Sequence, residues 1–89
     1  MKDILLNIEA IIFASEEGIT VNDLKQVLKD ALAIEINKQE VLELLKKIAE
    51  KYDDENQIFS LEVFHNQYQF LTKAKYHEAV NQLQAHKDK

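Results

Sequence analysis

The sequence of 89 residues contains no cysteine, no proline and a single glycine, Gly18. Without cysteine the chain can form no disulfide, no thiolate metal site and no thiol nucleophile. One glycine cannot build the glycine-rich loop that cradles a phosphate group. A small fold without disulfides is typical of a reducing compartment, so we expect a cytoplasmic location.

Arginine is also missing, because all 11 basic residues are lysines, and they face 16 acidic residues for a net charge of −5. Arginine is the preferred reader of guanine edges and phosphates. An acidic chain without arginine is therefore poorly suited to bind DNA by itself. No apolar run reaches the length of a membrane span. The first 15 residues include Asp3 and Glu9 and lack the cationic start of a signal peptide.

Catalytic and metal-binding patterns are missing as well. The histidines form no pair with another His, Asp or Glu at the spacing of a known zinc signature. The two serines lie outside any nucleophile motif. We therefore predict a domain that is not an enzyme and holds no metal or cofactor. The residues considered are His65, His77, His86, Ser15 and Ser60.

What is present is a helical pattern of apolar residues over the first half of the chain. Three helices are predicted, and each begins at a residue whose side chain can cap it, namely Asp3, Thr20 and Asn37. Gly18 can take a positive φ after the first helix, and Ile19 adds a short extended piece. The predicted bounds are Asp3–Ser15, Thr20–Leu32 and Asn37–Lys51.

The pattern changes to a period of two from Ile58 to Phe64, which predicts a strand. A short polar turn, His65-Asn66-Gln67, separates it from a second strand over Tyr68–Leu71, and helical spacing returns from about Lys73. Three helices followed by a hairpin predict an α+β, mostly α, fold. We expect a winged helix-turn-helix with a two-stranded wing and a C-terminal helix, as one domain over residues 1–89.

Three segments resemble the segregation and condensation protein B (ScpB) family. The run IEAIIFAS (residues 8–15) is similar to the family's opening helix, and ITVNDL (19–24) is similar to the start of its second helix. The segment YQFLTK (68–73), followed by Tyr76, resembles a third family motif. The wing turn departs from the family, which often has glycine there. The resemblance implies an N-terminal winged-helix domain, and we expect that the family's second winged-helix domain is absent from this chain.

The resemblance also implies a function. ScpB is a non-enzymatic subunit of the bacterial SMC–ScpA–ScpB condensin-like complex, which acts in chromosome condensation and segregation during cell division. It forms a homodimer and binds the kleisin ScpA, which connects it to SMC. The implied location is the nucleoid, and any DNA contact is indirect, through the complex.

The alternative is a winged-helix DNA-binding transcription regulator. Such a protein would present the third helix to DNA. The exposed face expected there carries acidic residues among its lysines, which favours a solvated surface over base reading. The residues of this face are Lys38, Gln39, Glu40, Glu43, Lys46, Lys47 and Glu50.

The first helix has two apolar faces instead of one. On a helical wheel Leu6, Ala10 and Phe13 lie nearly opposite a face of four isoleucines. Two interpretations stay open and have equal weight: either the domain covers both faces itself, or one face packs on a second copy. Phe64 is out of phase with the other apolar residues of its strand and is expected to face outward. The candidate contacts to a second copy or another partner are Leu6, Ala10, Phe13 and Phe64.

Overall fold

The computed structural model describes residues 3–87, and the side chains of residues 3–83. Its first half consists of α1 (Ile4–Ala14), α2 (Val21–Leu32) and α3 (Lys38–Tyr52). Each predicted N-cap is confirmed, because Asp3 accepts from Leu6 N, Thr20 accepts from Asp23 N, and Asn37 forms a capping box with Glu40. The predicted helix ends agree with the structure to within one residue.

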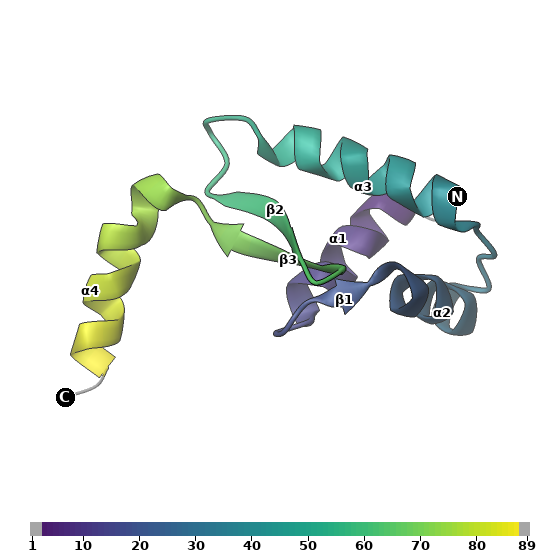
Figure 1. Ribbon diagram of the computed structural model, residues 1–89, viewed down its shortest axis with the longest axis horizontal. Coiled ribbons are helices and arrows are strands. Elements are labelled where there is room, and N and C mark those ends of the chain that lie inside the picture. Colours follow the sequence, from purple (N-terminus) through teal and green to yellow (C-terminus); the bar gives the residue numbers. More distant parts are fainter. Residues whose placement is uncertain (1–2, 88–89) are drawn as a thin grey trace.

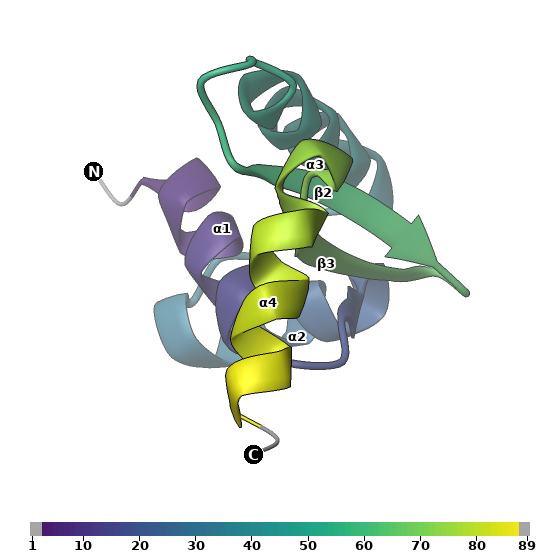
Figure 2. The same cartoon turned by 90° about the vertical axis from the view of Figure 1, so that its left-hand side faces the viewer.

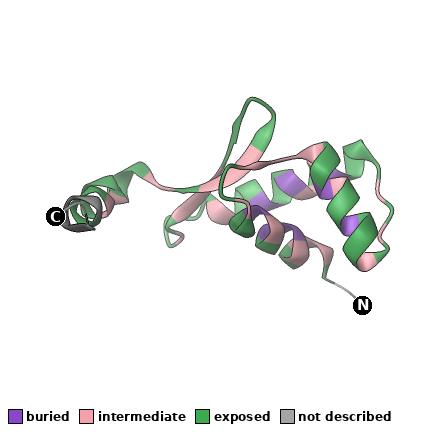
Figure 3. Ribbon diagram, turned by 90° about the horizontal axis from the view of Figure 1, so that it is seen from below, coloured by how far each residue is buried: buried purple, intermediate pink, exposed green. Residues whose placement is uncertain are grey.

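The core lies where the three helices meet. Each helix contributes buried apolar residues at helical spacing, although Val27 and Ala31 of the predicted α2 stripe are exposed. Figure 3 shows the buried positions on the helix sides that face one another. Burying a side chain of this size contributes roughly 1.5–3 kcal/mol relative to leaving it exposed. The buried residues are Ile8, Ile12, Leu24, Leu28, Val41, Leu45 and Ile48.

A three-stranded antiparallel sheet with the order β1-β3-β2 closes one side of the helices (Figure 1). Its strands are β1 (Ile19–Thr20), β2 (Phe59–Phe64) and β3 (Gln67–Thr72). The hairpin of β2 and β3 is the predicted wing. The predicted extended piece at Ile19 is the third strand, since Ile19 pairs with Tyr68.

The wing turn is one residue shorter than predicted. Gln67 belongs to β3 and pairs with Phe64, so the loop consists of His65 and Asn66 alone. Both have positive φ, at 50° and 66°, which is the geometry of a two-residue I′ turn. Asn66 tolerates this conformation well, so the turn forms without the glycine that the family often has there.

The last helix stands away from the rest of the molecule. A 3₁₀ turn, η1 (Ala74–Tyr76), leads into α4 (His77–Lys87), which extends from the sheet on the side opposite to α2 and α3 (Figures 1 and 2). The molecule is accordingly long, at 46 × 27 × 27 Å. The sequence predicts one helix from about Lys73, whereas the structure begins it with the 3₁₀ turn.

Candidate functional site

The outer side of α1 is an apolar surface that the described part of the chain leaves open. Ile8 and Ile12 are 0% and 1% exposed on the core side, whereas Leu6 is 54% and Phe13 46% exposed. Ala10 is exposed between them. We call Leu6, Ala10 and Phe13 the α1 face. Their i, i+4, i+7 spacing places them in one row along the helix, as the sequence predicts.

Phe13 has a second role at one end of the α1 face. Its ring stacks on Phe70 at a centroid distance of 4.4 Å and meets Phe59 edge-on at 5.0 Å. Phe70 in turn packs against Tyr52 at 4.8 Å. Such aromatic pairs are worth about 0.5–1.5 kcal/mol beyond their buried area. Phe13 therefore ties α1 to the hairpin while half of it stays exposed, so it is less free to vary than Leu6 or Ala10.

A buried carboxylate holds α1 in this orientation. Glu9 is only 5% exposed, and Lys51 Nζ lies 3.0 and 3.1 Å from its two carboxylate oxygens. The Tyr52 hydroxyl donates to Glu9 Oε1 at 2.6 Å. The hydrogen bond to Glu9, together with burial and the charge of Glu9, raises the pKa of Tyr52 to about 12. These contacts join the edge of the α1 face to the last turn of α3.

Sequence reasoning missed this group. On the helical wheel Glu9 lies between the two apolar faces, so the pattern treats it as a solvated separator. The available signal was a lone carboxylate in an otherwise apolar helix, which must find a partner if it is buried. Its partners Lys51 and Tyr52 are 42 and 43 residues away. Local spacing alone does not reveal them.

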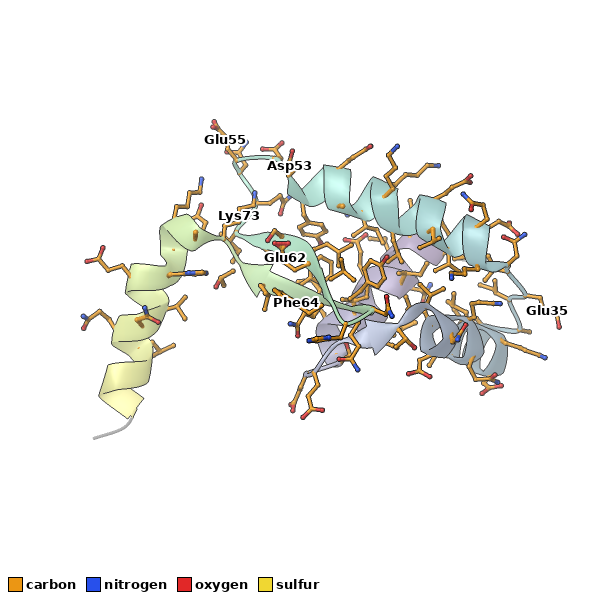
Figure 4. The ribbon with its side chains drawn as sticks, viewed as in Figure 1. Glu35, Asp53, Glu55, Glu62, Phe64 and Lys73 are labelled. Carbon is orange, nitrogen blue, oxygen red and sulfur yellow. The ribbon has the colours of Figure 1, made fainter. Side chains whose placement is uncertain are left out.

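Phe64 does not join the α1 face. It is 59% exposed, as predicted, and lies next to the turn at the tip of the hairpin (Figure 4). Phe59, which touches Phe13, is five residues earlier on the same strand, and that spacing corresponds to roughly 16 Å. The period of two also predicts that Val63 packs inward with Leu61. Val63 does face α3 on the same side as Leu61, but it stays 53% exposed there.

The outer face of α3 matches its prediction, since all seven residues expected to be exposed are exposed. A groove of about 250 Å³ runs between α3 and the wing, with Leu42, Leu61 and Val63 among its lining residues. Lys46 also lines it. Within residues 3–83 no cluster of His, Asp and Glu side chains could hold a metal ion. No helix in the described region is long and apolar enough to cross a membrane.

Comparison with known proteins assigns the family. Residues 6–89 match the family model described as segregation and condensation complex subunit ScpB. The chain belongs to the ScpB family. The resemblance carried by residues 8–15, 19–24 and 68–73 is thereby confirmed. None of the curated proteins compared with this ScpB-family chain matches it.

Two solved structures are similar to this ScpB-family chain. A conserved hypothetical protein from Chlorobium tepidum is 28% identical, with a TM-score of 0.74 over 90% of this chain and 47% of that one. The chain thus spans about half the length of the C. tepidum protein. A dimer of the ScpB N-terminal domain complexed with ScpA peptide is 18% identical, with a TM-score of 0.79 over 93% of each chain. This likeness confirms the predicted winged-helix fold.

Proposed function

We propose that this chain is a non-enzymatic, self-associating domain of a bacterial SMC–ScpA–ScpB complex that acts in chromosome condensation and segregation. Membership of the ScpB family supports the complex and the process. The fold shared with an ScpB N-terminal domain that was crystallised as a dimer with ScpA peptide supports equivalence to that domain. By the same reasoning ScpA is the partner that links the domain to SMC. The proposed location is the cytoplasm, in association with the nucleoid.

The observation that carries the proposal is the open α1 face. Monomeric proteins seldom leave one side of a central helix apolar and uncovered, and such a patch usually marks a contact with another protein. Covering Leu6 and Phe13 with a second copy would contribute roughly 1.5–3 kcal/mol for each side chain, less the part of Phe13 that is already covered. We propose that the α1 face is where a second copy docks.

DNA contact in this proposal is indirect. The α3 face that a winged-helix reader would present carries Glu40, Glu43 and Glu50, all exposed. Phosphate repels these carboxylates, and the lysines beside them do not outnumber them. No observation in the described residues favours the transcription-regulator alternative.

The test places charge on the α1 face without disturbing the core. Leu6→Glu combined with Ala10→Glu changes two exposed residues, so the fold should survive while self-association is lost. The matched control is Val27→Glu, which changes an exposed apolar residue of α2. Light scattering should give a monomer for the double variant and a dimer for the control, with equal helix content by circular dichroism. A double variant that is folded and still dimeric would show that a second copy docks elsewhere.

Binding of ScpA is measured on the same variants by titration calorimetry. We expect wild type and Val27→Glu to bind the ScpA of the same cell. A folded wild-type chain that does not bind ScpA would contradict membership of the complex, whatever its oligomeric state.

A further inference from the structure

Helix α4 is an arm with its own apolar stripe. Val80 and Leu83 are three residues apart on one side of α4, and Tyr76 precedes them in η1. Leu83 is 55% exposed, and neither it nor Val80 is among the residues that pack on the core. Figures 1 and 3 show the helix extending beyond the sheet, apart from the other helices. The apolar residues of α4 are therefore suited to packing against a partner, and the described residues of this chain do not provide one.

The base of the arm is fixed by specific bonds. Lys73 N donates to Ile58 O at 2.9 Å, and Lys73 Nζ donates to Asp54 O at 2.7 Å. Lys75 Nζ reaches Glu55 O at 3.1 Å. Figure 4 shows Lys73 close to the loop that carries Asp53 and Glu55. These bonds set the direction in which the arm leaves the sheet.

The exposed area of the whole chain exceeds that of a compact monomer. The surface is 6643 Å². A compact monomer of 10.4 kDa is expected to expose about 5,400 Å². The radius of gyration is 14.8 Å, against about 12 Å expected for a compact chain of this length. The excess of about 1,200 Å² is comparable with the ~800 Å² that each partner buries in a standard interface.

We propose that α4 of one copy packs across the α1 face of a second copy, and that α4 of the second copy packs across the α1 face of the first. The proposal rests on the self-association proposed above and names the element that covers the α1 face. Both helices have 11 residues, so each is about 16 Å long. The α1 face carries Leu6, Ala10 and Phe13, and the arm carries Val80 and Leu83, with Tyr76 of η1 at its base.

Area and symmetry favour a second copy as the occupant. One face of an 11-residue helix covers only about 300 Å², from its length and radius. A contact between two α1 helices alone would therefore stay well below the ~800 Å² per partner of a standard interface. Exchange of arms doubles the contact to about 600 Å² per partner, at the lower end of stable interfaces, because every chain both supplies an α4 and receives one. The same chain supplies the arm and the receiving face, so a two-fold pair closes without a third component.

The first test adds charge to the arm alone. Val80→Glu with Leu83→Glu alters the apolar stripe, and Asn81→Glu with Gln82→Glu adds the same charge to exposed positions beside it. Because these side chains do not pack on the core, both variants should stay folded, with the wild-type helix content by circular dichroism. Sedimentation equilibrium should show at least a tenfold weaker dimer for the first variant and little change for the control. If the wild type and both variants dimerise equally, arm exchange is wrong although self-association stands. A monomeric wild type overturns both.

The second test locates the contact by cross-linking, with no background because the chain has no cysteine. Ala10→Cys combined with Leu83→Cys places one thiol on the α1 face and one on the arm. After mild oxidation a non-reducing gel should show a covalent dimer that reverts on reduction. An intramolecular disulfide would show that the arm folds back on its own α1. A non-covalent dimer without any disulfide would show that the arm packs on a surface other than the α1 face of the second copy. Either outcome overturns the exchange.

Discussion

The Tyr52 hydroxyl donates a 2.6 Å hydrogen bond to Glu9, the one charged residue that is buried in the described part of the chain. Lys51 balances the charge of the same carboxylate at 3.0 Å. A buried carboxylate is tolerated only when it is paired and hydrogen-bonded, and here both partners come from the end of α3. The group therefore fixes how α1 lies against α3, and with it which side of α1 faces outward.

Tyr52→Phe should weaken the fold. The change leaves Glu9 buried without one of its donors, and a hydrogen bond to a charged group is worth about 1.5–3 kcal/mol. Urea denaturation at one fixed protein concentration should show a fall of that order in the free energy of unfolding. Tyr76→Phe, at a tyrosine whose hydroxyl lies outside this group, should change it by no more than about 0.5 kcal/mol. Equal values for the two variants would show that the hydrogen bond to Glu9 contributes nothing.

The Tyr52 hydroxyl should also ionise at an unusually high pH. Because folding raises its pKa from 10.0 to about 12, its neutral form favours the folded state. This contribution is complete below pH 10 and is lost as the pH rises through about 12. Tyrosinate absorbance should show an ionisation step near pH 12. The late step should be missing in Tyr52→Phe. A wild type without an ionisation step near pH 12 would contradict the geometry around Glu9.

Most of the fold could be predicted from the sequence because its signals are local. Asp3, Thr20 and Asn37 cap their helices as their positions predict. The alternation of apolar and polar residues, with a period of two, locates the hairpin. The β1–β3 pairing was less visible, since β1 has only two residues and its partner lies 49 residues away at Tyr68. Helix spacing cannot show such a pairing.

Two positions with positive φ should respond in opposite directions. Gly18 has φ +93°, and a Cβ there would lie 3.0 Å from Gln67 Cβ, so Gly18→Ala should destabilise by about 1–3 kcal/mol. Ala33, which ends α2 at φ 55°, pays for a left-handed conformation that glycine adopts freely. Ala33→Gly should therefore stabilise by about 0.5–1 kcal/mol. Thermal and urea unfolding measure both. A tolerated Gly18→Ala would mean that β1 does not approach β3 as described.

The chain should bind duplex DNA only weakly at physiological salt. Fluorescence anisotropy with a 20-base-pair duplex should show no saturable binding at micromolar protein. Glu40→Lys with Glu43→Lys should create binding whose affinity falls steeply with added salt, because it depends on phosphate contacts. Tight wild-type binding that survives physiological salt would support the transcription-regulator alternative.

The candidate site was only partly accessible to sequence reasoning. The wheel of α1 predicts two apolar faces, and the structure shows which one is open, with Leu6 exposed and Ile8 buried. Two features depend on tertiary contacts and could not be predicted. One is the pairing of Glu9 with Lys51 and Tyr52. The other is the direction of α4, which bonds from Lys73 to the loop after α3 determine.

The most direct test of self-association is sedimentation equilibrium of the wild-type chain from submicromolar to hundreds of micromolar concentration. One chain has a mass of 10.4 kDa, and self-association predicts a transition to twice that mass within this range. A folded chain that stays at 10.4 kDa up to the highest concentration would contradict it.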